Sequence, residues 1–122
     1  MASPISRVDV VGIPSSDAER SRGFYVDTLG LRPDENARYE FRVESTFFAI
    51  WQPAQFGVEY QPQANSIVLL RVDDVPAARA ELEAEGVEFS GDTFDTGVCH
   101  MAFFTDPDGN DLMLHSRHAP VK

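Results

Sequence analysis

The 122-residue chain has a single cysteine, Cys99, and no apolar run of the roughly eighteen residues that a membrane-spanning helix needs. One cysteine excludes an internal disulfide and any zinc site built from several cysteines. The amino-terminal residues also lack the hydrophobic stretch of a signal peptide, so we expect a cytoplasmic protein. The Gly-x-Ser-x-Gly elbow, the phosphate-binding loop and the dinucleotide fingerprint are all missing, which excludes the usual hydrolase, kinase and dehydrogenase routes.

Basic residues are scarce: ten lysines and arginines face twenty aspartates and glutamates, for a formal net charge of −10. Such a charge repels phosphate backbones and anionic lipid surfaces, so we expect neither a nucleic acid nor a membrane as partner. The acidic residues either keep the protein soluble or attract a cationic ligand. The charge alone leaves both interpretations open.

A hydrophobic fraction of 43% over this length predicts one domain with a real core, spanning residues 1–122. The first half contains a β-rich run, Arg7–Ile13, followed by Ser16-Asp-Ala-Glu19, which has the spacing of a capping box and predicts a helix start. One helical face gathers Ala18, Ser21, Tyr25 and Leu29, and Gly30 is placed to end the helix. Two strands are then expected at Tyr39–Glu44 and Phe47–Trp51, before a loop over residues 52–65.

The second half repeats this pattern with an offset of 57 residues, which pairs Val10 with Ile67 and Asp17 with Asp74. A strand at Ile67–Val72, a helix capped by Asp74 and ended at Gly86, and three more strands are expected; these strands are Val87–Phe89, Val98–Thr105 and Asp111–His115. The fold class is therefore α+β, with two βαβββ modules. Module one covers about 7–51, the linker 52–65, module two about 66–115 and the tail 116–122.

Asp106-Pro-Asp-Gly109 has the residues of a tight turn and lies between two apolar runs, so it predicts a hairpin. The phrase Asp106-Pro-Asp-Gly-Asn110-Asp-Leu-Met113-Leu resembles the closing hairpin of the vicinal oxygen chelate superfamily, which includes glyoxalase I, extradiol dioxygenases and bleomycin resistance proteins. Val10–Leu31, with Ser21, Phe24-Tyr25 and Leu29-Gly30-Leu31, resembles the opening motif of the same superfamily. The resemblance covers about Val8 to His115 and implies curled mixed sheets that form an open cup.

The resemblance also implies where a divalent metal would be held: by a histidine on the first strand of each module and a carboxylate on the last strand. These positions hold Val10, Ile67 and Met113. Apolar side chains cannot replace the hydration shell of a dication. We therefore expect no metal and no other cofactor at the inherited site.

The three histidines leave two further possibilities. His100 and His115 lie on strands that pair in the predicted hairpin, so a displaced metal site with Glu44 is conceivable, and His100 alone could act as a general base with Glu40, Glu44 or Asp111 as orienting carboxylate. His118, in the polar tail, is expected to be solvated. Otherwise these histidines donate hydrogen bonds at the wall of a pocket.

Aromatic residues favour a binding protein, because small-molecule sites are mainly apolar with a few orienting polar groups. The expected ligand-binding residues are Trp51, Phe47, Arg42, Arg71, His100, Val10, Ile67 and Met113. We expect metal-independent binding of a small apolar or aromatic molecule by a homodimer, with sequestration of a toxic natural product as one biological task. A lyase, isomerase or dioxygenase with a displaced metal site, or with His100 as base, is the alternative.

Overall fold

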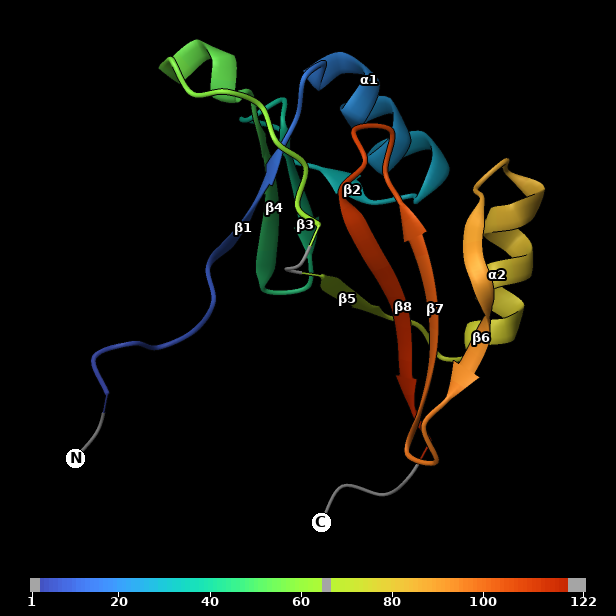
Figure 1. Cartoon of the computed structure of the whole chain (residues 1–122). Helices are drawn as coiled ribbons and strands as arrows, with labels where there is room; N and C mark the ends of the chain where they lie inside the picture. Colours follow the sequence, from blue (N-terminus) through green and yellow to red (C-terminus); the bar gives the residue numbers. More distant parts are fainter. Residues whose placement is uncertain (1–2, 65–66, 119–122) are drawn as a thin grey trace. The chain divides into compact units, whose positions relative to one another are not determined.

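The computed structural model describes residues 3–64 and 67–118 and has an α+β fold (Figure 1). The chain divides into two units, Met1–Tyr60 and Gln61–Lys122. Each unit follows the order β-α-β-β-β and forms one open, four-stranded mixed sheet. The predicted fold class and the predicted repeat of two βαβββ modules are confirmed. Residues 65 and 66, at the predicted junction of linker and second module, and 119–122 of the predicted tail lie outside the described residues.

In the first unit, the first strand lies at the edge of the sheet and pairs with the last strand. Its elements are β1 (Val10–Pro14), α1 (Ala18–Gly23) with a π-helical turn (Phe24–Thr28), β2 (Arg32–Pro33), β3 (Glu40–Val43), β4 (Thr46–Trp51) and a 3₁₀ turn (Pro53–Phe56). The strand order is β1-β4-β3-β2, with β1 parallel to β4 and the other pairs antiparallel. The sequence pattern missed β2, because two residues are too few to show alternation.

Helix α1 begins differently from the prediction. Asp17, rather than Ser16, is the N-cap residue, and its side chain accepts a hydrogen bond from the Arg20 backbone N–H at 3.1 Å. Glu19 does not reach back to close a capping box; it binds Arg38 and Tyr39 instead. Gly30 follows the helical segment with φ of +73°, the left-handed conformation that glycine tolerates without strain, as predicted.

The core of the first unit lies between the sheet and this helical segment. Tyr25 is fully buried and its ring stacks on Phe41, with 5.9 Å between centroids, and meets Phe48 edge-on at 6.2 Å. Ile13 of β1 and Ile50 of β4 are buried on the same sheet face. The predicted face of Ala18, Ser21 and Tyr25 is therefore the one that packs against the sheet.

The second unit repeats the topology of the first. Its elements are β5 (Val68–Arg71), α2 (Val75–Ala84), β6 (Phe89–Asp95), β7 (Cys99–Thr105) and β8 (Asp111–Arg117), and the strand order is β5-β8-β7-β6. Asp74 caps α2 as predicted, accepting from the Ala77 N–H at 3.0 Å. The predicted strand Val87–Phe89 has the wrong bounds, since β6 begins at Phe89 and continues through mostly polar positions to Asp95.

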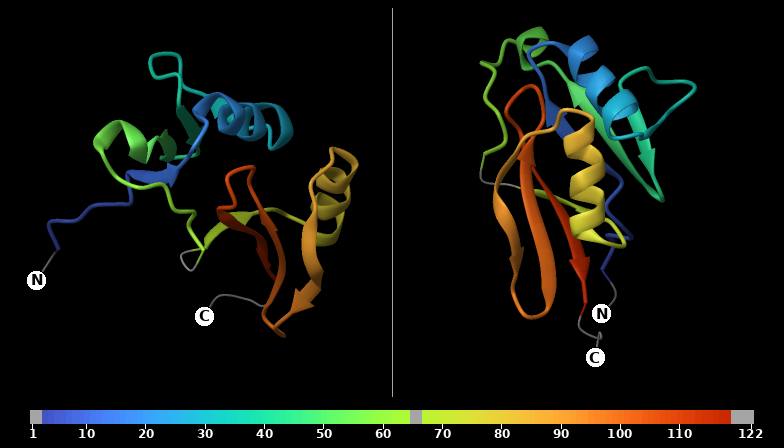
Figure 2. Two further views of the ribbon diagram at one scale, coloured as in Figure 1. Left: turned by 45° about the horizontal axis from the view of Figure 1, so that its top comes forward. Right: turned by 90° about the vertical axis from the view of Figure 1, so that its right-hand side faces the viewer.

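Helix α2 packs across β6, β7 and β8 and covers one face of the second sheet (Figure 2). The residues buried beneath it include Val75, Ala102, Phe104, Leu112 and Leu114. Arg79 of α2 also fixes the irregular middle of β6, because its guanidinium donates to the Gly91 carbonyl at 2.8 Å and lies 4.9 Å from the Phe89 ring centroid. Strand β6 shows a register shift at this point.

The hairpin between β7 and β8 is closed by a buried polar network. Asp106 Oδ1 accepts from the backbone N–H groups of Asp108 and Asn110, both at 2.9 Å, and Asp106 Oδ2 accepts from the Asn110 side chain at 2.8 Å. The Asn110 Oδ1 atom in turn accepts from the Gln63 N–H at 2.8 Å. The predicted turn is confirmed, and the same residues fasten the segment before β5 to the start of β8.

Candidate functional site

The first sheet has a helix-free face, which is the face opposite α1. The register aligns Val10 of β1, Phe47 of β4 and Arg42 of β3 in one cross-strand row, because these residues are direct Cα partners. Pro14 and Trp51 form another row on this face. Four residues that the sequence nominated for ligand binding therefore share one surface: Val10, Arg42, Phe47 and Trp51.

Trp51 is the largest side chain on this face and is 38% exposed. Its ring lies beside Gly12, where a Cβ atom would be 3.7 Å from the indole Cδ1 and Nε1 atoms. The ring centroids of Trp51 and Phe56 are 6.2 Å apart. Phe56, at the end of the 3₁₀ turn, is itself 71% exposed. Among the described residues no acceptor is found for the indole N–H, so Trp51 offers both an apolar surface and a hydrogen-bond donor.

Two arginines lie on the same face, because Arg32 of β2 is the direct Cα partner of Arg42 of β3. The Arg42 guanidinium carbon is 5.9 Å from the centroid of the Phe47 ring, and Arg42 Nε donates to the Glu44 carbonyl at a long 3.4 Å. Val10, the third member of this row, is 44% exposed. The row thus combines an aliphatic, an aromatic and two cationic groups within one strip of surface, which is the composition of a small-molecule site with a few orienting charges.

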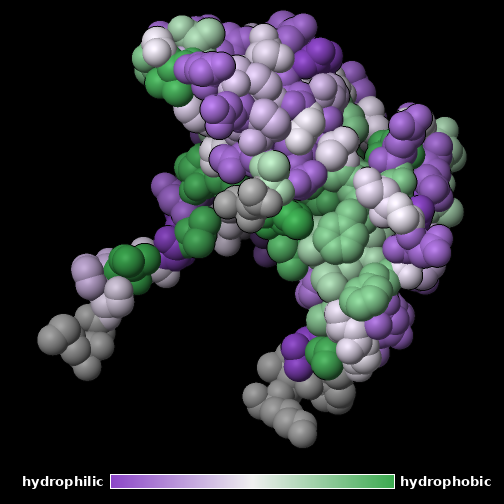
Figure 3. Space-filling model, in the orientation of Figure 1, coloured by the Kyte–Doolittle hydropathy of each residue, from purple (hydrophilic) through white to green (hydrophobic). Residues whose placement is uncertain are grey.

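The second sheet also has a helix-free face, opposite α2. It carries Leu69, Arg71, Met101, Phe103, Met113 and His115, which alternate with the residues buried under the helix. Leu69 is 51% exposed, and Phe94 of the neighbouring β6 is 55% exposed. The space-filling view shows hydrophobic residues gathered over β7 and β8 (Figure 3). Arg71 pairs with Asp73 at 2.7 Å, in an exposed contact of the kind that contributes little stability.

The donor atoms at the expected metal positions do not fit a divalent ion. Val10 and Ile67 present only hydrocarbon, and Met113 offers only a thioether sulfur, in a residue that is 7% exposed. Zinc, iron and manganese sites are built from imidazole, carboxylate or thiolate ligands. These three residues are therefore suited to an apolar surface and not to the coordination that the resemblance implied.

His100 lies on the opposite face of the second sheet from Arg71 and Met113. Its Cα partner on β8 is Ser116, whereas His115 is paired with Met101, so the two histidine side chains leave the sheet on opposite faces. The structure therefore does not bring His100 and His115 together in a displaced metal site. It places His100 on the α2-covered face, at the far end of the β6–β7 hairpin.

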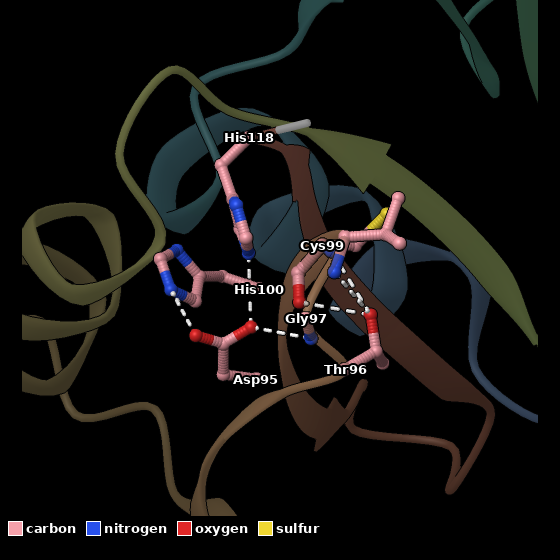
Figure 4. Close-up of polar contacts among 7 residues, drawn as sticks. Asp95, Thr96, Gly97, Cys99, His100 and His118 are labelled. Atoms are coloured by element: carbon pink, nitrogen blue, oxygen red, sulfur yellow. Dashed lines mark hydrogen bonds and ion pairs between the residues drawn. The ribbon is translucent and has the colours of Figure 1, made fainter. Parts of the chain in front are cut away.

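At that end His100 meets two residues that sequence reasoning passed over. Its Nε2 atom is 3.3 Å from Asp95 Oδ2, and His118 Nε2 is 2.9 Å from Asp95 Oδ1 (Figure 4). The His118 ring, helped by the Gly97 backbone N–H, lowers the pKa of the Asp95 carboxyl to about 2. Asp95 and His100 flank a turn that contains Gly97, and this spacing was the available signal; it was missed because β6 was not predicted to reach Asp95.

The fold and the repeated topology define a class of protein in which two βαβββ modules are joined in one chain. The sequence profile of the Glyoxalase/Bleomycin resistance protein/Dioxygenase superfamily matches residues 7–114. The chain belongs to this superfamily, which confirms the resemblance drawn from the motifs. A search of curated proteins found no match. No helix in the described part of the chain combines the length and the hydrophobicity that crossing a membrane requires.

Solved structures extend the comparison. TnmS3, described as an antibiotic binding protein from Streptomyces sp. CB03234, is 29% identical over 95% of this chain and 99% of its own, with a TM-score of 0.74. A glyoxalase/bleomycin resistance protein from the same strain is 28% identical over 90% of this chain and 100% of its own, with a TM-score of 0.68. A lactoylglutathione lyase from Agrobacterium tumefaciens, 15% identical over 92% of this chain and 94% of its own (TM-score 0.74), shares the fold.

Proposed function

We propose that this protein binds a small, mainly apolar or aromatic molecule against the helix-free faces of its sheets, without a metal ion. The observation that carries the proposal is the row of Val10, Phe47 and Arg42 beside Trp51 on one exposed surface. Isolated exposed apolar residues need no explanation, but a sheet face that gathers them beside two arginines, Arg42 and Arg32, has the makeup of a ligand site. On the second sheet Arg71 and Met113 have the corresponding role, and Ile67 directly precedes β5.

One of the similar proteins supports binding over catalysis. TnmS3 is described as antibiotic binding, and it is similar to this chain over nearly the full length of both. Sequestration of a toxic natural product is therefore the task we propose. The apolar side chains at Val10, Ile67 and Met113 agree with it, because an organic ligand needs a dry surface where a catalytic metal needs donor atoms.

We further propose that the protein acts in the cytoplasm as a homodimer, with neither nucleic acid nor membrane as partner. The dimer follows from the superfamily resemblance, and light scattering coupled to size exclusion tests it by giving twice the mass of one chain. The net charge of −10 argues against partners with anionic surfaces.

The binding proposal is tested first by a thermal-shift screen of the purified protein against aromatic metabolites and peptide antibiotics, because a ligand of the native state raises its apparent stability. For a compound that binds, we expect Trp51→Ala to weaken the calorimetric affinity by about tenfold or more, since a large aromatic contact is lost. In the wild type the same compound should quench the fluorescence of Trp51, the single tryptophan.

Three controls sharpen this test. Trp51→Phe keeps the aromatic surface and loses the N–H group, so its affinity should be intermediate. Val58→Ala removes an exposed apolar side chain outside the sheet and should leave affinity unchanged. Dialysis of the wild type against EDTA should also leave affinity unchanged. An unaltered affinity in Trp51→Ala would contradict the proposed site, and loss of binding after EDTA would contradict metal independence.

The enzymatic alternative has one observation in its favour. His100 has a carboxylate neighbour, Asp95, at 3.3 Å, and a histidine oriented by a carboxylate is a common general base. The predicted orienting residues Glu40, Glu44 and Asp111 do not fill this place. Turnover that disappears in His100→Ala, while ligand affinity is retained, would favour the enzyme over the binding protein.

A further inference from the structure

Asp95, His100 and His118 form a three-residue cluster at the end of the second sheet, on the face that α2 covers. Asp95 is the last residue of β6, His100 the second residue of β7, and His118 follows the end of β8. The three potential ligand atoms lie within 4.8 Å of one another. Figure 4 shows both imidazole rings directed at the two oxygens of the same carboxylate.

The distances within the cluster are close to those of a coordinated ion. With bonds of about 2.0 to 2.2 Å to each ligand, the donor atoms of a tetrahedral or octahedral site are roughly 3.0 to 3.5 Å apart. Here the two nitrogen-to-oxygen separations are 3.3 Å for His100 and 2.9 Å for His118. The imidazole rings are 4.7 Å apart between centroids and tilted by 40°, and all three donor atoms lie within 4.8 Å of one another.

The backbone holds the three ligands in place without help from an ion. Asp95 and His100 are direct Cα partners across the hairpin, and the His118 backbone N–H donates to the Val98 carbonyl at 2.8 Å. The Gly97 N–H donates to Asp95 Oδ1 at 2.8 Å, which orients the carboxylate. Thr96 Oγ1 accepts from the Cys99 N–H at 2.9 Å and tightens the turn between them. Such outer contacts are what position metal ligands in proteins.

We propose that Asp95, His100 and His118 bind a divalent transition-metal ion. Two imidazoles and one carboxylate favour Zn²⁺, Cu²⁺ or Ni²⁺ over Mg²⁺ and Ca²⁺, which prefer ligand sets made only of oxygen. The side chains are between 37% and 55% exposed, so water completes the coordination shell. Three protein ligands with an open, wet position define a site that takes up and releases its ion readily.

This site is separate from the proposed ligand surface and does not depend on it. The alternation along β7 and β8 directs His100 to the α2-covered face and Met113 to the helix-free face, so the sheet itself lies between them. A bound ion would join the chain after β8 to the β6–β7 hairpin. Its expected effect is therefore on the stability of the second unit, and metal-independent ligand binding on the helix-free faces is retained.

The test is calorimetric titration of the tag-free, chelator-treated protein with Zn²⁺, with Mg²⁺ as a comparison ion. We expect one equivalent of Zn²⁺ to bind, a rise in melting temperature with Zn²⁺, and no response to Mg²⁺. His118→Ala, His100→Ala and Asp95→Asn should each weaken Zn²⁺ binding by at least about tenfold. In wild-type NMR spectra the ring signals of His100 and His118 should shift on Zn²⁺ addition.

His115→Ala is the matched control, because this histidine lies on the same pair of strands and faces the opposite side. It should bind Zn²⁺ as the wild type does, and its ring signal should not shift. Folding of each variant is checked by its unfolding transition without metal; Asp95→Asn preserves the shape of the side chain if an alanine variant is unstable. Absence of stoichiometric binding, binding unaffected in His118→Ala, or equal loss in His115→Ala would each overturn the proposal.

Discussion

The side chain of Glu19 holds a segment that is neither strand nor helix, the residues Arg38 and Tyr39, against α1. Its carboxylate accepts from Arg38 Nε at 2.8 Å, from Arg38 Nη2 at 2.6 Å and from the Tyr39 hydroxyl at 2.5 Å. The bidentate contact with the guanidinium joins α1 to the residues just before β3. These hydrogen bonds favour the charged carboxylate; the Arg38 side chain, followed by the Tyr39 hydroxyl, lowers the pKa of Glu19 to about 2.

This shift predicts a pH dependence of stability. The pKa of Glu19 is lower in the folded chain than its ordinary value of 4.5, so the folded state binds fewer protons and gains stability from this group at pH above 4.5. The contribution is lost as pH falls from 4.5 through about 2. NMR titration of the Glu19 side chain should give a midpoint near 2 in the wild type and a higher midpoint in Arg38→Gln, which stays below the ordinary value because the Tyr39 hydroxyl still donates to Glu19.

Arg38→Lys separates charge from geometry, because lysine keeps the positive charge but cannot form the two parallel hydrogen bonds. In Arg38→Lys the titration midpoint of Glu19 should lie between the midpoints of the wild type and Arg38→Gln. Unfolding measured across the acid range should show a weaker dependence on pH in Arg38→Gln than in the wild type. A Glu19 midpoint at the ordinary value in the wild type would mean that the contact does not form in solution.

At the scale of elements, the closing turn between β7 and β8 depends on Asn110, which is 1% exposed. Its side chain donates to Asp106 and accepts from the Gln63 N–H, so Asn110→Ala leaves buried partners without hydrogen bonds. We expect the free energy of unfolding to fall by about 1 to 3 kcal/mol. Chemical denaturation measures this directly. Asn36→Ala, at an exposed asparagine, is the matched control and should change stability by less than about 0.5 kcal/mol.

The helices and most strands could be predicted because their signals are local. The cap at Asp74, the glycines at Gly30 and Gly86, and the turn at Asp106–Gly109 each depend on nearby residues, and all occur as expected. Strand β6 could not be predicted, since its residues are mostly polar and it is held by β7 and by Arg79 of α2. Ser16 and Asp17 are adjacent possible caps, and only the final backbone geometry selects Asp17.

The two candidate sites also differ in how far they could be predicted from the sequence. Strand alternation is enough to place Phe47 and Trp51 on one face, and the predicted surface of the first sheet required little more. The cluster of Asp95, His100 and His118 depends on the register of three strands and on where β6 and β8 end. No periodicity in a single segment contains that information, so His118 was expected to be a solvated tail residue.

At the scale of the whole molecule, the chain uses one topology twice and carries a net charge of −10. A field of this sign attracts cations over a distance of about 10 Å at 0.1 M salt and about 3 Å at 1 M. Arg32, Arg42 and Arg71 are cations on the helix-free faces, and Arg42 and Arg71 already contact acceptors of the chain. The net charge of the molecule therefore favours a cationic ligand, while the arginines on the sheet faces favour a ligand that carries a hydrogen-bond acceptor.

The balance of these two effects can be measured with a pair of aromatic probes of matched shape, N-methylacridinium and acridine, at a pH where acridine is neutral. If the field of the whole molecule dominates, the cation binds more tightly at low salt, and its advantage shrinks towards none as NaCl approaches about 1 M, because screening then confines the field to the surface. The affinity of acridine should change little. Equal affinities at low salt, or an advantage that salt leaves unchanged, would show that the acidic residues serve solubility and that contacts on the sheet faces select the ligand.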